Sequence, residues 1–249
     1  MLVVFISNLA RPAAVEADVL AQMLGMTAYD TRLALAAGPP SILLMTPDRD
    51  RANDAAGLLR SRGHGAHVFD DETFTASESM PRADDFLLEA EGMRRTQSGE
   101  LLPYGDVYAI LRAVHDATSE LERHARPQIG ERPLISSHAP RVVSKNEDRE
   151  HVAYFFRRSG EKPWLLRERH ASYVGLGSDR TPIAFVNFTR TLTRMREASA
   201  MAIYDDRLSR RRIAERAGAE GQRSSREGMD LLAHLLAMTI ASQGGSPYR

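Results

Sequence analysis

Apolar residues in the first 70 positions alternate between short unbroken runs and stripes at helical spacing. The runs at residues 2–6 and 42–45 predict strands that are covered on both faces, and residues 66–69 predict a third strand. The stripes between these runs predict three helices, in the order strand, helix, helix, strand, helix, strand. Because helices that join strands cover the sheet they connect, this order predicts a layered βααβαβ module over residues 1–70.

Each predicted helix has start or stop signals that agree with its stripe. The first carries Glu16 and Asp18 near the positive end of the helix dipole and ends at Gly25. The second begins at Thr27, and two consecutive prolines prevent its continuation. The third begins near residues 46–48. The apolar stripes consist of Val15, Val19, Leu20, Met23 and Leu24 in the first helix, Tyr29 and Leu33 in the second, and Ala52, Ala55, Ala56 and Leu59 in the third.

The paired helices around residues 25–33 are followed by a helix and a strand that carry Ala52, Ala56, Leu59, Gly63, Ala66 and Val68. In this order the residues resemble the C-terminal domain of the ribosomal stalk protein, a fold shared with the Clp protease adaptor. The resemblance implies a fold that is used for protein contacts. The stalk domain offers a lysine-rich face to translation factors, whereas the lysines of this chain, Lys145 and Lys162, lie outside the module. The resemblance therefore does not imply the function of the stalk protein.

A polar segment separates the module from the rest of the chain. Residues 71–83 contain serine and proline and predict a linker. Residues 84–89 then predict a strand, and a polar turn at residues 97–100 folds it back on residues 101–102. This strand begins a second, strand-rich α+β domain that we expect to extend over residues 84–206.

A strong amphipathic pattern follows Pro103. Apolar residues recur there at helical spacing and predict a helix that runs towards Leu121. A long loop with three prolines is predicted next, over residues 126–140. The stripe of the predicted helix consists of Val107, Ile110, Leu111 and Val114.

Further apolar runs predict an antiparallel sheet in the second domain. The runs lie at residues 142–143, 152–156 and 164–166, and residues 159–161 supply the hairpin turn between the last two. A helix is predicted to open at residues 181–182. Its stripe includes Phe185, Phe188, Leu192 and Met195.

Residues 102–107, the sheet that follows them, residues 173–177 and residues 187–188 together resemble bacterial pleckstrin-homology-like domains. Members of that family use their barrel for binding rather than catalysis, which implies a binding role for the second domain. The helix predicted after Pro103 departs from the uninterrupted series of strands in that family.

Arginine is concentrated in residues 207–227, which predict a basic connector before an amphipathic C-terminal helix at residues 228–242. A basic stripe neutralises phosphates, so the connector is a candidate nucleic-acid contact. Glutamates balance its charge and no aromatic residue there can stack on bases, so a solvated connector is the competing interpretation. The final helix either completes the core or meets a partner. The candidate nucleic-acid contacts are Arg210, Arg211, Arg212 and Arg216.

Composition limits the function classes. Lys and Arg total 33 and Asp and Glu total 33, so no net charge attracts the whole chain to nucleic acid or an anionic membrane. The absence of Cys removes disulfides, thiolate nucleophiles, cysteine zinc sites and iron–sulfur clusters. Residues 2–6 are too short for a signal-peptide core, and no apolar run approaches the roughly 20 residues that cross a bilayer. We therefore expect a cytoplasmic protein without a membrane span.

No constellation of residues predicts a catalytic centre, a cofactor site or a metal site. His64 and His67 do not have the spacing of histidines on a zinc-binding helix. Adjacent residues rarely point at each other, so the serines and histidine at 136–138 do not predict a nucleophile and its base. Residues 70–72 predict a solvated strand end, and residues 205–207 predict a helix cap with an ion pair. Other histidines lie near charged residues without the pattern of a general base: His124, His138, His151 and His170.

The sequence therefore predicts an α+β protein with an N-terminal βααβαβ module and a strand-rich domain that has closing helices. The leading hypothesis is a non-catalytic binding or regulatory protein that acts through protein contacts or self-association. One alternative is a nucleic-acid-binding protein that uses the arginines of residues 207–226. The other is an enzyme whose site is assembled only in the fold.

Overall fold

The computed structural model describes residues 1–116, 149–210 and 225–243, and its helices and strands confirm the α+β class. The helices are α1 (Ala13–Leu24), α2 (Ala28–Ala36), α3 (Arg49–Ser61), α5 (Ala184–Ala198) and α7 (Ser225–Gln243). The strands are β1 (Leu2–Asn8), β2 (Ser41–Thr46), β3 (Gly65–Asp70), β4 (Phe86–Leu88), β5 (Gly92–Arg95), β6 (Leu101–Pro103), β7 (Val107–Asp116), β8 (Arg149–Arg157), β9 (Trp164–Arg167) and β10 (Ile203–Asp205). Short 3-10 helices are η1 (Asp71–Thr73), η2 (Ser77–Ser79), η3 (Tyr104–Asp106), η4 (Val174–Asp179) and η5 (Arg207–Ser209).

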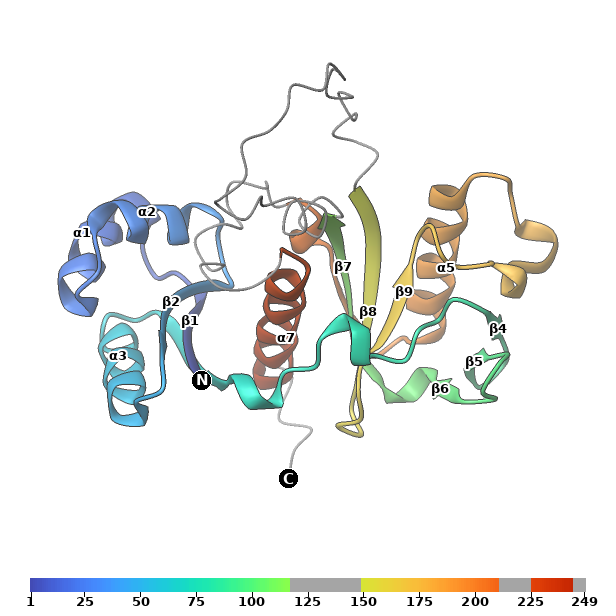
Figure 1. Cartoon of the computed structure of the whole chain (residues 1–249), viewed down its shortest axis with the longest axis horizontal. Coiled ribbons are helices and arrows are strands. Elements are labelled where there is room, and N and C mark those ends of the chain that lie inside the picture. Colours follow the sequence, from blue (N-terminus) through green and yellow to red (C-terminus); the bar gives the residue numbers. More distant parts are fainter. Residues whose placement is uncertain (117–148, 211–224, 244–249) are drawn as a thin grey trace, which may run out of the picture.

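The described strands form three sheets. The first sheet has the order β2-β1-β3 and is antiparallel throughout. The second sheet has the order β10-β7-β8-β9, in which β10 runs parallel to β7 and the other neighbours are antiparallel. The third sheet has the order β4-β5-β6 and lies, with α5, on the side of the second sheet that faces away from α7 (Figure 1).

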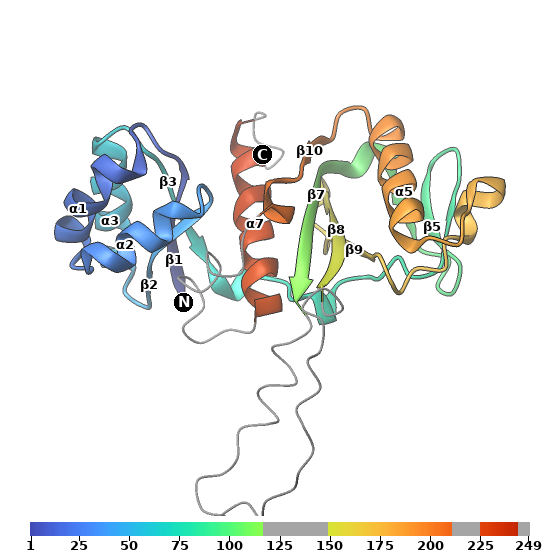
Figure 2. The same ribbon diagram turned by 90° about the horizontal axis from the view of Figure 1, so that it is seen from above.

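Helix α7 lies between the first and the second sheet (Figures 1 and 2). Val3 and Phe5 of β1 belong to the core on one side of it. Leu111 and Tyr154 of the second sheet belong to the same core on the other side. The large apolar side chains of the amphipathic helix predicted at residues 228–242 are buried in this core: Met229, Leu232, Leu235, Leu236 and Ile240. The final helix therefore belongs to the core of its own chain, and it occupies the centre instead of closing an edge.

The first 70 residues have the predicted βααβαβ order of elements. Alternate side chains of β1 face α1 and α3 on one side and α7 on the other, so this strand is covered on both faces as predicted. Gly25 adopts the left-handed conformation that ends α1, with φ of 66°. The Thr27 side chain caps α2 by accepting a hydrogen bond from the Asp30 N–H.

The buried faces of α1 and α2 differ from the predicted stripes. Val15 is 62% exposed and Tyr29 is 73% exposed, although both belong to those stripes. Glu16 is fully buried instead, because Arg62 and His64 surround its carboxylate. Apolar periodicity cannot predict a face that contains a buried acid. The side chains that α1 buries are Glu16, Ala17, Leu20, Ala21 and Leu24.

The prediction of a helix after Pro103 is wrong, because residues 107–116 form the strand β7. This strand pairs with β8 and is buried on both faces, with Ile110 in the core beside α5 and Leu111 in the core beside α7. A strand that is covered on both faces lacks polar alternation, so its apolar residues can match helical spacing by coincidence. Residues 107–116 therefore do not contain the helix that was expected to interrupt the series of strands.

The third sheet contains a strand, β5, that the predicted hairpin omits. The turn at residues 97–100 joins β5 to β6, and β4 pairs with β5. Gly92 begins β5 where a Cβ atom would lie 2.2 Å from the carbonyl oxygen of Leu102, so only glycine fits there. The loop and strand predicted at residues 126–140 and 142–143 lie outside the described residues.

Residues 71–83, which the sequence predicts to be a linker, pass alongside α7 and reach the edge of the second sheet. The Ala83 N–H donates to the Leu165 carbonyl at 2.9 Å, and the Leu165 N–H donates to the Pro81 carbonyl at 2.9 Å. These two hydrogen bonds attach the segment to β9, which is an edge strand. Hydrogen bonds thus hold the segment against the second sheet.

Candidate functional site

Four buried polar side chains form a network between η2, β7, β8 and α7: Ser77, His115, Tyr154 and Asp230. The Asp230 carboxylate accepts hydrogen bonds from the Tyr154 hydroxyl at 2.5 Å and from the Ser77 hydroxyl at 2.5 Å. It also accepts one from the Ser77 N–H at 2.8 Å. His115 Nε2 lies 2.7 Å from the Tyr154 oxygen and 3.3 Å from Asp230 Oδ1.

Hydrogen bonds keep the charge of this network on Asp230. Burial raises the pKa of Asp230, but the hydrogen bonds of the network, above all that from His115, outweigh burial and lower this pKa. Burial and the nearby Asp230 charge raise the pKa of Tyr154 well above its ordinary value. The network thus holds an ionised carboxylate and a neutral phenol. Because these groups are buried and bonded to one another, they fasten η2 and β8 to α7 rather than facing a ligand.

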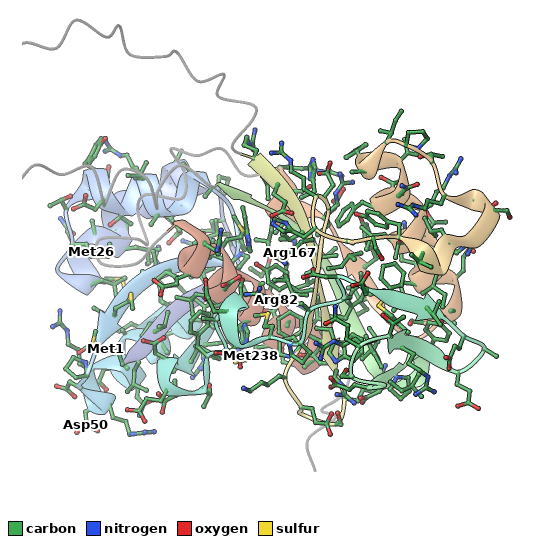
Figure 3. All side chains as sticks on the ribbon, turned by 45° about the vertical axis from the view of Figure 1, so that its right-hand side comes forward. Met1, Met26, Asp50, Arg82, Arg167 and Met238 are labelled. Carbon is green, nitrogen blue, oxygen red and sulfur yellow. The ribbon has the colours of Figure 1, made fainter. Side chains whose placement is uncertain are left out.

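A cleft of about 460 Å³, which we call the α7 cleft, opens beside the C-terminal half of α7. The turn between β8 and β9, at residues 160–163, forms one wall. Figure 3 shows Met238, which lines this cleft, in the middle of the molecule between Asp50 of the module and Arg167 of β9. Aromatic and apolar side chains dominate the rest of the lining: Phe69, Tyr108, Phe156, Ala237, Met238 and Ala241.

His234 is the histidine in the lining of the α7 cleft. Its Nδ1 lies 3.2 Å from the Asp230 carbonyl oxygen, and its Nε2 accepts a hydrogen bond from the Thr75 N–H at 3.3 Å. Burial lowers the pKa of His234 to about 4, so the imidazole is neutral at physiological pH. Its ring lies edge-on to Phe156, with centroids 5.1 Å apart. Because both nitrogens have partners, His234 contributes a flat, neutral surface to the cleft rather than a free base.

Charged side chains stand at the mouth of the α7 cleft. Arg157 donates from Nε to Asp106 Oδ2 at 2.6 Å and forms a second ion pair with Glu161. Lys162 is exposed at the same wall, and no acid among the described residues forms an ion pair with it. The cleft therefore combines an apolar lining with the positive charge of Lys162 at its entrance.

The structure describes one of the four candidate nucleic-acid contacts. Arg210 is exposed and donates from Nη2 to Asp206 Oδ2 at 2.8 Å. Arg211, Arg212 and Arg216 lie outside the described residues. The ion pair predicted at residues 205–207 is present, because the Asp205 carboxylate accepts hydrogen bonds from the backbone and side chain of Arg207.

The described histidines do not assemble a metal site. The Ala10 N–H donates to His64 Nδ1 at 3.1 Å, and His67 Nε2 lies 2.9 Å from the Ser7 hydroxyl. In the described ranges, no group of three or more His, Asp or Glu side chains is arranged to hold a metal ion. The serines and histidine at 136–138 and His124 lie outside these ranges.

Asp230 and His234 were not among the predicted functional residues, although both are polar residues inside an apolar helix. Residues 229–241 are otherwise almost continuously apolar or small. A carboxylate and an imidazole four residues apart on such a helix share one face, and burial requires partners for both. This spacing was the available signal. No such signal marked the partners Ser77 and Tyr154, because they lie 153 and 76 residues away from Asp230 in the sequence.

Comparisons with protein-family models, curated proteins and solved structures find no match for this chain. None of the helices in the described part is both long and apolar enough to cross a membrane. The function of the chain must therefore be inferred from the geometry of its clefts and of the groups that line them.

Proposed function

We propose that this chain is a non-catalytic binding or regulatory protein that receives an apolar side chain of a protein partner in the α7 cleft. The observation that carries the proposal is the cleft itself, an opening of about 460 Å³ with a mainly aromatic and aliphatic lining. Concave apolar surfaces of this size are typical sites of recognition. The cleft also lies between two sheets that share one hydrophobic core through α7, so it is formed before a partner arrives.

The lining also defines the chemistry of the partner. His234 has partners for both ring nitrogens, so the deep part of the cleft favours an apolar group over a polar one. Lys162 at the entrance favours a carboxylate next to that group. We therefore expect the partner segment to carry a large apolar side chain beside an acidic residue.

A peptide selection tests this function directly. Random peptides are selected against the full chain, and the affinity of the enriched peptides is measured by fluorescence anisotropy. Ala241→Trp fills the cleft at the last turns of α7, whereas Ala36→Trp adds the same side chain at an exposed position of α2. Enriched peptides should combine an apolar and an acidic residue and should lose binding to Ala241→Trp but not to Ala36→Trp. Peptides that bind both variants equally would contradict the proposal.

Charge reversal at Lys162 examines the entrance separately. Lys162→Glu should weaken the binding of acidic peptides and should leave peptides with a neutral flank unaffected. Native mass spectrometry over a concentration series then distinguishes a foreign partner from a second copy of the chain. A dimer that Ala241→Trp abolishes would identify the second copy as the occupant.

The two alternative hypotheses remain predictions. Nucleic-acid binding through residues 207–226 gains no support from Arg210, which Asp206 holds in an ion pair. An enzyme would need a polar group that is free to act on a substrate, and the imidazole that lines the α7 cleft already has two partners.

A further inference from the structure

A second groove lies at the opposite end of the second sheet from the α7 cleft. The cleft meets β8 at Phe156 and Arg157, where the strand ends, whereas the groove meets β8 at Arg149 and His151, where the strand begins. The groove has a volume of about 350 Å³ and lies on the α5 side of the sheet. We call it the arginine groove, and its lining includes Arg149, His151, Glu168, Arg169 and Phe185.

Arg112 of β7 adds a third guanidinium directly beside this lining. Its guanidinium carbon lies 5.3 Å from the ring centroid of Phe185 and 5.7 Å from that of Phe188, and its Nη2 lies 3.4 Å from His151 Nδ1. Within the described ranges, no carboxylate forms an ion pair with Arg112. Aromatic faces therefore accommodate this charge, and its field extends into the arginine groove.

His151 lies among the three arginines of the groove. Burial, together with the smaller effect of the charges of Arg112, Arg149 and Arg169, lowers the pKa of His151 to about 4. The nearby acids are engaged in holding the groove together. Glu168 accepts a hydrogen bond from the His151 N–H at 3.3 Å, and Glu150 accepts one from the Arg169 N–H at 3.0 Å.

We infer that the arginine groove binds a small phosphate-bearing molecule, with the phosphate held by Arg149 and Arg169 and a planar ring on Phe185. Guanidinium groups match the geometry of phosphate oxygens, and several of them around one groove suit a doubly charged anion. Phe185 is 44% exposed, so part of its ring surface is open to stacking. The volume is typical of small-molecule sites. The flanking Glu150 and Glu168 disfavour the passage of a long polyanion.

Binding is tested with four probes on the full chain: adenosine 5′-monophosphate, ribose 5-phosphate, inorganic phosphate and adenosine. Isothermal titration measures affinity, and the ring protons of His151 are followed by NMR over pH. We expect the nucleotide to bind most tightly and to raise the pKa of His151, because an anion offsets the field of the arginines. Arg169→Gln, at an exposed position, should weaken binding by about tenfold or more.

The control variant is Arg194→Gln, which removes an arginine of α5 that pairs with Asp179 outside the lining of the groove. It should leave nucleotide binding unchanged. Equal loss in both arginine variants, equal binding of adenosine and the nucleotide, or binding of oligonucleotides alone would overturn the inference. Phe185→Ala should reduce the nucleotide to the affinity of ribose 5-phosphate. If wild-type protein binds those two probes equally, the ring does not lie on Phe185.

Discussion

Glu16 in α1 and Asp230 in α7 are both fully buried carboxylates, but different donors stabilise them. Glu16 receives two hydrogen bonds from the Arg62 guanidinium, at 2.8 and 3.0 Å. Asp230 receives hydrogen bonds from the hydroxyls of Tyr154 and Ser77 and from the Ser77 N–H, and His115 Nε2 lies 3.3 Å from its Oδ1. The module therefore surrounds its buried carboxylate with an arginine, whereas the core around α7 surrounds its buried carboxylate with hydroxyls, a backbone N–H and an imidazole.

The difference determines what each carboxylate holds together. The Arg62 side chain is 23% exposed, so the pair with Glu16 reaches solvent and joins α1 to the end of α3 within the module. The Asp230 network is closed to solvent and joins three elements that are distant in the sequence. Since β8 and α7 line the α7 cleft, the Asp230 network maintains the shape of the proposed binding site, whereas the Glu16 pair maintains only the module.

The largest effect is expected from removing the Asp230 carboxylate. Asp230→Ala leaves the donors of Ser77, Tyr154 and His115 without their acceptor, so the free energy of unfolding should fall by about 3–5 kcal/mol. Urea denaturation followed by circular dichroism measures the loss. Asp54→Ala, at an exposed site of α3, should change stability by less than about 0.5 kcal/mol. Equal losses in the two variants would remove the distinction between the network and an ordinary surface acid.

Acidification should act next most strongly, through His234 beside the Asp230 network. The folded-state pKa of about 4 lies below the free-histidine value of 6.5, so the unfolded chain binds this proton at higher pH than the folded chain. The contribution of neutral His234 to the free energy of unfolding is fully present above about pH 6.5. This contribution falls by up to about 3 kcal/mol as the pH is lowered towards 4. His234→Phe should flatten the dependence of urea stability on pH in this window. An unchanged slope would show that His234 is not the titrating group.

The module could be predicted because its signals are local. Gly25 and Thr27 act on their own helix ends, and the structure uses both as predicted. The strand β7 could not be predicted in this way, because its conformation depends on pairing with β8 and on burial by two separate layers. Residues such as Ile110 and Leu111 look alike in a helix that is half buried and in a strand that is buried on both faces.

The candidate sites were less predictable than the fold. Glu16 was expected to interact with the helix dipole at the start of α1. It is buried instead, and its burial depends on Arg62, which lies 46 residues later in the sequence. The α7 cleft combines β3, the β8–β9 turn and α7, and the arginine groove combines β7, β8 and the start of α5. Such groups meet only after long-range strand pairing, so their spacing in the sequence carries no signal. Asp230 and His234 were the exception, as polar residues one turn apart in an apolar helix.

The smallest expected effect is a difference in salt dependence between the two carboxylates. Raising NaCl from 0.1 to 1 M shortens the screening length from about 10 Å to about 3 Å. Screening weakens an ion pair that reaches solvent but hardly affects a carboxylate whose donors are all buried. Glu16→Gln should therefore reduce the salt dependence of urea stability, and Asp230→Asn should leave it as in the wild type. If both variants change the salt dependence equally, solvent ions reach Asp230 as well, and the core around α7 is not closed in solution.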